Sequence, residues 1–222
     1  FTEDHLEPIQ LSSDISYGRE IDNLDNLLFY SDPTPGESNS TPGYNEFCGE
    51  PDFSIDGGLY SGNVSLSLSS DLNNFNIYYS LDGSDPTSES LLYVNEIQIF
   101  ETTVVKASII SANCFNTNFK TQTYFINEDT NLPIISLSTD PENLWNNDTG
   151  IYVLGDNAAN DMPFFGANFW EDWEKPAHIE FFENDGNLGF SLDVGIKIFG
   201  GWSRANEQKS LAVFARSEYG SN

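Results

Sequence analysis

The chain has 222 residues, of which 35 are acidic and 8 are basic, giving a formal net charge of −27 at pH 7. This charge excludes a general nucleic-acid binder, because phosphate backbones need a cationic surface, and it argues against docking on anionic lipid. Aromatic residues form 14% of the chain, which favours a folded protein over a disordered one, and no apolar run is long enough to cross a membrane.

The first 45 residues form the first of three predicted parts. Residues 31–43 are dense in Pro, Gly and Ser, which predicts a linker. The strings at residues 16–20 and 33–39 resemble the closing strands of a lamin-tail domain, another Ig-like β-fold. The chain starts at Phe1 without a signal-peptide pattern, so we expect a mature or excised piece that lacks the beginning of this domain.

Residues 46–128 carry a series of short strand patterns separated by turn signals. Apolar–polar alternation or enrichment in β-prone residues predicts strands at residues 64–69, 76–81, 96–100, 103–110 and 120–126. Roughly five to seven strands in about 80 residues, with turns between them, predict a β-sandwich of immunoglobulin-like size.

Two strings in this part, at residues 51–60 and 78–87, resemble the small β-sandwich at the C-terminus of chitobiases and β-hexosaminidases. The second string, Tyr-Tyr-Ser-Leu-Asp-Gly-Ser-Asp-Pro-Thr, carries most of the likeness, which covers about residues 46–128. In that family the module is an accessory domain without catalytic residues of its own. The resemblance therefore implies an Ig-like accessory domain here, and it adds a carbohydrate-associated role to the alternatives.

Cys48 and Cys114 are the two cysteines of the chain, and neither belongs to a CxxC pair. Two thiols without a nearby His pair do not complete a tetrahedral metal site. A disulfide and a pair of unbonded structural cysteines are the alternatives. A bridge would contribute about 4 kcal/mol of stability in the chain-entropy model, and it would favour an extracellular or cell-surface protein.

Residues 129–222 form the third predicted part. Asp140 precedes Pro and Glu, which predicts the N-cap of one helical turn. Strands are predicted at residues 133–139, 177–183 and 188–199, and the last two are joined by an Asp-Gly hairpin signal.

Several strings of this third part resemble, in the right order, the beginning of a CotH-type domain, a secreted kinase-like family named for a spore-coat protein. They lie at residues 132–137, 150–153, 168–182 and 195–216. The resemblance covers residues 131–222 and implies transfer of a phosphoryl group from ATP, with Mg²⁺ or Mn²⁺, in the intact parent. The family's catalytic Asp would follow residue 222, so we assign no catalytic residue and expect no bound cofactor in this stretch alone.

A basic segment lies near the end of this acidic chain. Kinase-like folds place a glycine-rich turn over the phosphates and a lysine on the following strand. The resemblance therefore implies nucleotide contacts at Gly200, Gly201, Ser203, Arg204, Lys209 and Arg216. The alternative is a glycine-rich hairpin whose basic side chains pair with neighbouring carboxylates.

Other side chains invite weaker hypotheses. Asp82 and Asp85 could supply oxygen ligands to Ca²⁺, although turn chemistry alone explains the Asp-Gly-Ser-Asp-Pro sequence. His178 is predicted to lie in or beside a strand rather than to be catalytic. The four tryptophans are expected to pack in cores, with a sugar-binding platform as the alternative.

Together these observations predict a mainly β protein, with Ig-like β-sandwich modules in tandem followed by the β-rich N-terminal part of a kinase-like α+β domain. The expected boundaries are 1–45, 46–128 and 129–222. The leading hypothesis is a piece of a large secreted or cell-surface protein with a CotH-like kinase domain. The alternatives are a non-catalytic adhesive or structural surface protein and a carbohydrate-associated module. The expected partners are other domains of the same chain, with surface proteins and glycans as alternatives, and neither nucleic acid nor membrane insertion.

Overall fold

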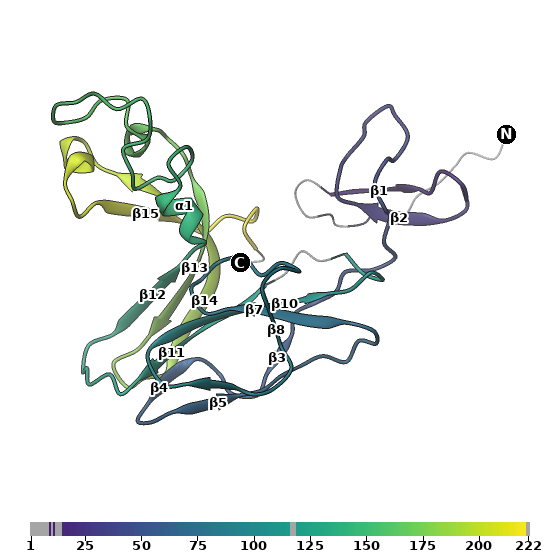
Figure 1. The fold of residues 1–222 in the computed structure, drawn as a ribbon, viewed down its shortest axis with the longest axis horizontal. Helices are drawn as coiled ribbons and strands as arrows, with labels where there is room; N and C mark the ends of the chain where they lie inside the picture. Colours follow the sequence, from purple (N-terminus) through teal and green to yellow (C-terminus); the bar gives the residue numbers. More distant parts are fainter. Residues whose placement is uncertain (1–8, 10, 12–14, 116–118, 221–222) are drawn as a thin grey trace.

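The computed structural model describes residues 9, 11, 15–115 and 119–220. In this part the protein is mainly β, as the sequence predicts, with strands grouped into several sheets. Figure 1 shows three groups of elements that follow one another along the chain. Among the described residues, no helix has the length and apolar character that a membrane crossing needs.

The first group is a small antiparallel hairpin, made by β1 (Ser16–Arg19) and β2 (Leu27–Tyr30). Aromatic rings connect it to the rest of the protein. Phe29 packs 4.5 Å from the ring of Phe47, and Phe47 packs 6.0 Å from Phe115. These contacts fix the hairpin to the start of the second group without a sheet that continues between them.

The second group, which we call the sandwich module, contains nine strands. They are β3 (Asp52–Phe53), β4 (Gly58–Tyr60), β5 (Val64–Leu66), β6 (Leu68–Ser69), β7 (Asn76–Ser80), β8 (Leu91–Leu92), β9 (Ile97–Ile99), β10 (Thr103–Ile110) and β11 (Lys120–Ile126). A five-stranded sheet has the order β4-β11-β10-β7-β8, and two short pairs, β3-β6 and β5-β9, lie apart from it. Alternate residues of these strands point inward and form one core, as an Ig-like sandwich requires.

The single strand predicted at residues 64–69 is two strands in the structure. Val64–Leu66 pairs with β9, whereas Leu68–Ser69 pairs with β3. Between them, the N–H of Ser67 donates to Ser54 Oγ, and its carbonyl accepts from the N–H of Ser54. The alternation persists through the break because Leu66 and Leu68 both face the core, so the sequence pattern could not reveal the change of partner.

The third group, which we call the meander module, is built on a four-stranded antiparallel sheet in the order β12-β13-β14-β15. Its elements are β12 (Ile134–Ser138), α1 (Pro141–Trp145), η1 (Asn168–Trp170), β13 (Lys175–Phe182), β14 (Leu188–Phe199), η2 (Trp202–Ala205) and β15 (Ser210–Phe214). Asp140 caps α1 as predicted, because its carboxylate accepts from the N–H of Glu142 at 2.8 Å.

One face of this sheet packs on a core of its own. Val194, Ile196 and Ile198 of β14 point to this face, where residues from the long connection between β12 and β13, including Ile151 and Phe169, cover them. The opposite face carries polar side chains along β13 and β14. That polar face lies toward the sandwich module, with β12, β13 and β14 drawn alongside β11 (Figure 1).

Candidate functional site

Strand β11 is buried on both of its faces. Tyr124 and Ile126 point into the sandwich core. Thr121, Thr123 and Phe125 point the other way and are also buried. A strand at a free surface would leave one face to solvent, so the outer face of β11 is covered by the meander module.

An aromatic pair forms the apolar part of this contact. Phe125 of β11 meets Phe182 of β13 edge-to-face, with ring centroids 5.5 Å apart. The ring of Phe182 is fully buried. An edge-to-face pair of buried rings adds about 0.5–1.5 kcal/mol to the stabilisation from the area that it removes from water.

A carboxyl group is buried beside this pair. Glu180 of β13 is 2% exposed and accepts a hydrogen bond from Thr123 Oγ1 of the sandwich module. Since the Thr123 hydroxyl donates its one proton to Glu180, Ser136 Oγ, 2.7 Å away, donates to Thr123. Burial raises the pKa of Glu180, and the hydrogen bond from Thr123 and the nearby His178 oppose that rise.

The Asp-Gly-Ser-Asp-Pro turn makes a second contact between the modules. The N–H of Asp85 donates to Asp140 Oδ2 at 3.0 Å. The same Asp140 carboxylate caps α1 through its other oxygen. Gly83 has φ +84°, and a Cβ there would lie 3.1 Å from the carbonyl oxygen of Thr139. This turn is therefore held directly against the start of α1.

Asp82 and Asp85, the two candidate calcium ligands, already bind other protein groups in this turn. Asp82 Oδ1 accepts from the N–H and the hydroxyl of Ser84, and these bonds lower the pKa of Asp82. Asp85 forms an ion pair with Lys106. Within the described ranges, no three His, Cys, Asp or Glu side chains gather as a metal site would need.

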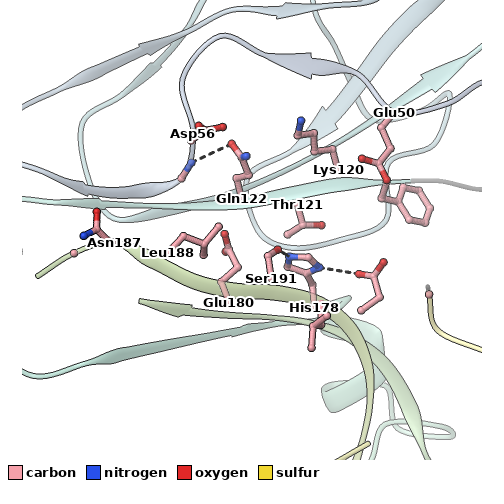
Figure 2. A pocket seen from close by; sticks show the side chains of 16 residues that line it. Glu50, Asp56, Lys120, Thr121, Gln122, His178, Glu180, Asn187, Leu188 and Ser191 are labelled. Carbon is pink, nitrogen blue, oxygen red and sulfur yellow. Dashed lines mark hydrogen bonds and ion pairs between the residues drawn. The ribbon is translucent and has the colours of Figure 1, made fainter. Parts of the chain in front are cut away.

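A cavity of about 500 Å³ opens between the two modules. Figure 2 shows Lys120, Thr121 and Gln122 of β11 on one side and His178, Glu180 and Ser191 on the other. The cavity's remaining lining residues are Glu50, Asp56, Gly57, Phe119, Gly186, Asn187, Leu188, Leu192, Asp193 and Gly220. The wall is mostly polar and comes from both modules, so docking of the modules creates the cavity.

Both ring nitrogens of His178 form hydrogen bonds within this cavity. Its Nδ1 lies 2.7 Å from Asp193 Oδ1, and its Nε2 lies 2.9 Å from Ser191 Oγ. In the antiparallel register His178 is opposite Asp193, and Ser191 is opposite Glu180. All four side chains therefore lie on the same face of the sheet.

Sequence reasoning placed His178 in a strand but did not single out Ser191 or Asp193. A signal was present in the sequence. His178 and Glu180, and Ser191 and Asp193, are polar pairs at i, i+2 on two strands joined by a hairpin, which places them on one face. Such a polar face normally points to solvent, and nothing in the pattern shows that a second module covers it.

The residues of the basic segment have separate surroundings. Gly200, with φ +124°, Gly201 and Ser203 lie in the connection from β14 to β15 that contains η2. Arg204 donates to the carbonyls of Gly200, Phe169 and Trp170, and Arg216 forms ion pairs with Glu174 and Glu218.

Lys209 differs from these two arginines. Its Nζ donates to the carbonyl of Asn206 and lies 4.1 Å from the ring centroid of Phe169. Partial burial lowers its pKa. In the described part of the chain, no carboxylate lies within 4.0 Å of its amino group. The structure thus uses Arg204 and Arg216 to hold the protein together and leaves Lys209 without an acidic partner among these residues.

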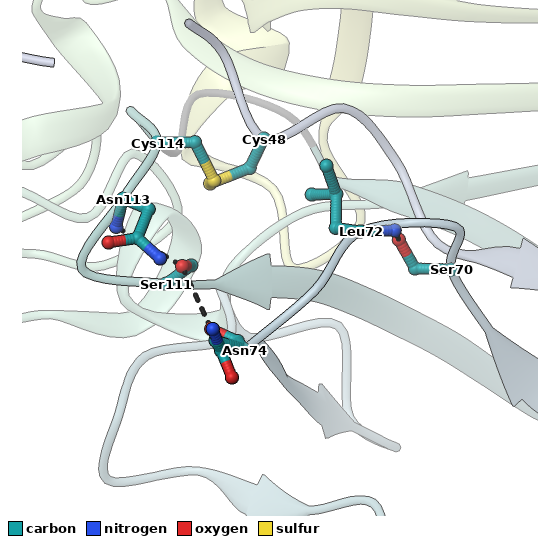
Figure 3. The surroundings of a disulfide bond; sticks show 7 residues. All are labelled: Cys48, Ser70, Leu72, Asn74, Ser111, Asn113 and Cys114. Carbon is teal, nitrogen blue, oxygen red and sulfur yellow. Dashed lines mark hydrogen bonds between the residues drawn. A yellow bond between two sulfur atoms is a disulfide. The ribbon is translucent and has the colours of Figure 1, made fainter. Parts of the chain in front are cut away.

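The predicted cysteine pair is joined in the structure. Cys48 and Cys114 form a disulfide with a Cα–Cα distance of 4.9 Å, and Figure 3 shows it beside the turn that contains Ser111 and Asn113. Both half-cystines are buried in the sandwich core. The bond ties the chain entering the sandwich module to the loop between β10 and β11.

Comparison with known proteins identifies one part of the chain. Residues 55–121 match the family model of the chitobiase/beta-hexosaminidase C-terminal domain. The sandwich module thus contains a domain similar to this family, as the Leu-Asp-Gly-Ser-Asp-Pro-Thr string suggested. No curated protein matches the chain, and no solved structure matches it. The lamin-tail and CotH resemblances lie outside the matched residues and remain proposals.

Proposed function

We propose that the chain is an accessory unit of a larger secreted or cell-surface protein, in which the sandwich module holds the meander module in a fixed orientation. The observation that carries this proposal is the two-sided burial of β11, whose outer face contacts β13 through Thr123 and Phe125. A strand that gives one face to the sandwich core and the other to the interface links the stability of both modules.

The buried carboxyl group strengthens the argument. Separating the modules would leave Phe125 and Phe182 in water, which costs about 25 cal/mol for each Å² of apolar surface exposed. Docking, conversely, buries Glu180, and such burial is tolerated only because Thr123 supplies a hydrogen bond from the other module. The interface therefore specifies one register between the two modules.

The family match and the disulfide support the secreted or cell-surface location in this proposal. A disulfide persists mainly in oxidising environments, and the matched family is named for carbohydrate-active enzymes. We assign residues 1–45 to the end of a lamin-tail-like domain, 46–128 to the sandwich module and 129–222 to the N-terminal part of a CotH-like domain. In this arrangement the sandwich module is a carbohydrate-associated spacer between two other domains.

Fixed docking can be tested by fluorescence, because all four tryptophans lie between residues 145 and 202, in the meander module. Tryptophan emission reports the meander module alone, whereas far-ultraviolet circular dichroism reports both. We expect the two thermal transitions of the natural chain to coincide. Phe125→Ser should separate them, since Phe125 lies outside the sandwich core. Separate transitions in the natural chain would contradict the proposal.

A second candidate function is a nucleotide-phosphate contact at Lys209, as the CotH resemblance implies. The favouring observation is that Lys209 has no acidic partner among the described residues, although the chain has 35 acids. Arg216 does not fit this role, because it already forms ion pairs with two glutamates. Arg204 fits it less well than Lys209, because its guanidinium group donates to three carbonyls and Lys209 Nζ donates to one. One lysine without an acidic partner among the described residues supports a weak contact rather than a complete nucleotide site. Bound ATP would supply the phosphoryl group to chemistry whose other residues are not in this stretch.

Isothermal titration with Mg-ATP and with Mn-ATP tests this candidate. We expect weak binding that Lys209→Met abolishes. Lys175→Met is the matched control, because Lys175 lies over the ring of Trp173 in the same module and has no ion pair among the described residues. Equal loss in both variants would indicate only a general effect of charge and would reject the Lys209 site.

A further inference from the structure

The cavity between the modules contains a continuous chain of hydrogen bonds that ends at a serine hydroxyl. It runs from Asp193 to His178 at 2.7 Å and from His178 to Ser191 at 2.9 Å. Both Asp193 and Ser191 lie on β14, and His178 lies opposite them on β13. The regular spacing of the sheet, rather than a loop, therefore sets the distances between these three side chains.

The chemistry of the three groups fixes where the protons lie. An ionised carboxylate only accepts hydrogen bonds, so His178 Nδ1 carries the proton that Asp193 accepts. In the neutral imidazole, Nε2 then has a free lone pair, and the Ser191 hydroxyl donates to it. The proton of Ser191 points at a base, while the oxygen lone pairs stay available to a molecule in the cavity.

We propose that Ser191 is a nucleophile for acyl transfer from small polar esters, with His178 as its general base and Asp193 as a positioning residue. A Ser–His–Asp constellation is recognised by geometry and roles, whatever the order of its members in the chain. Here the carboxylate bonds one ring nitrogen and the hydroxyl the other, which is the connectivity that such chemistry needs.

The reaction balances with these groups alone. Ser191 Oγ attacks the ester carbonyl carbon, the new Oγ–C bond forms, and the hydroxyl proton passes to His178 Nε2. Asp193 stabilises the imidazolium through Nδ1–H. Collapse of the tetrahedral intermediate breaks the bond to the alcohol, which leaves with the proton from His178. Water then releases the acyl group as a carboxylic acid by the same steps, with His178 again taking the proton.

The cavity sets the class of substrate. Its volume of about 500 Å³ and its mostly polar wall suit a small polar molecule. Thr121 of β11 brings a hydroxyl donor to the side of the cavity opposite Ser191, whereas Lys120 and Gln122 point away from Ser191 (Figure 2). A hydroxyl donor of this kind can stabilise an oxyanion when it develops. The position of Thr121 rests on the docked arrangement proposed above, whereas the three reacting side chains all belong to the meander module.

The proposal is tested by labelling the intact 222-residue chain with a fluorophosphonate probe and locating the label by mass spectrometry. Ser191 Oγ would bond to phosphorus, fluoride would leave, and the proton would pass to His178. We expect one label per chain, on Ser191, that Ser191→Ala abolishes. His178→Gln and Asp193→Asn should each slow labelling by about 100-fold or more, because both remove activation by the base.

Ser65→Ala is the matched control, because the Ser65 hydroxyl is also exposed on a strand and bonds a carboxylate, Glu96 at 2.6 Å, instead of an imidazole. Its labelling should equal that of the natural chain. Circular dichroism confirms that each variant is folded. Labelling at another residue, labelling of Ser191 that is unchanged in His178→Gln, or no labelling of the folded natural chain would each overturn the proposal. Coincident thermal transitions in the same sample would show that fixed docking survives such a failure.

Discussion

The sandwich and meander modules are both built from antiparallel strands, yet they use their polar residues differently. In the sandwich module the polar side chains of the Asp82–Asp85 turn bond to each other or to the neighbouring module. In the meander module, polar side chains occupy strand interiors, at His178, Glu180 and Ser191, and line a cavity. Polar residues at turns therefore explain local structure, whereas polar residues inside strands indicate a contact surface or a site.

The two modules also differ in how they hold their positive charge. Lys106 of the sandwich module is bound to Asp85. The meander module holds five of the eight basic residues, and four of them, Lys197, Arg204, Lys209 and Arg216, bind acidic or carbonyl groups of the protein. The basic segment thus balances charge and supports the fold to a large extent, and Lys209 has no carboxylate partner among the described residues.

Removing the disulfide should have the largest effect, and it should act on the sandwich module first. Cys48 and Cys114 are 66 positions apart, so their bond stabilises the fold by about 4 kcal/mol in the chain-entropy model. We expect the double variant Cys48→Ala/Cys114→Ala to lower the urea midpoint of the whole chain. If the modules are coupled, tryptophan emission from the meander module should show the same loss. An unchanged emission midpoint would show that the modules unfold independently.

Shortening Phe182 should be the next largest change. Phe182→Ala removes a fully buried ring, and such a change costs about 3–5 kcal/mol. Phe190→Ala is the control on the neighbouring strand, because Phe190 is 42% exposed and stacks on Phe181. Its loss of unfolding free energy should be clearly smaller. Equal losses, measured by urea unfolding, would place Phe182 outside the interface core.

Thr123→Val should cost less but should be more specific to the interface. Valine has nearly the shape of threonine but cannot donate to Glu180, so a buried carboxyl group loses its partner from the other module. An unsatisfied buried polar group costs about 1–3 kcal/mol. Thr123→Ser, which keeps the hydroxyl, should recover most of this loss in the same unfolding experiment. Similar losses in both variants would show that the effect is not specific to the hydrogen bond.

Glu180→Gln should give the smallest change and a defined pH dependence. Since burial raises the folded pKa of Glu180 above its unfolded value, its contribution to stability is greatest below the unfolded pKa and is lost as pH rises through the folded pKa. Glutamine removes this dependence and can still accept from Thr123. The variant should therefore gain stability relative to the natural chain at neutral pH, and the gain should disappear in acid. A gain that grows as the pH falls would contradict the sign of the shift.

Much of the fold could be predicted from the sequence, because period-2 alternation marks strands such as β9 and β10 and Asp140 marks the start of α1. The short strands β4 and β8 could not, since two or three residues show no period. The change of partner between β5 and β6 was missed because both halves keep the same inward face. Each of these misses concerns pairing, which sheet neighbours decide and local sequence does not record.

The site was harder to predict than the fold. Thr121 and Thr123 of β11 have the pattern of solvent-facing residues, and only the meander module makes them buried. Similarly, Ser191 and Asp193 could be recognised as site residues only once the strand register had placed them beside His178. The basic segment, in contrast, was conspicuous in the sequence, but its function depended on which acids and carbonyls lay nearby. Composition reveals charge, whereas the fold decides which charges are already paired.

The central claim is that the two modules form one rigid unit through the outer face of β11. Residual dipolar couplings measured on the intact chain test this most directly, because each module reports its own alignment tensor. We expect one common tensor for residues 52–115, 119–126 and 134–214. We also expect Phe125→Ser to split this tensor into two. Two different tensors in the natural chain would contradict the claim.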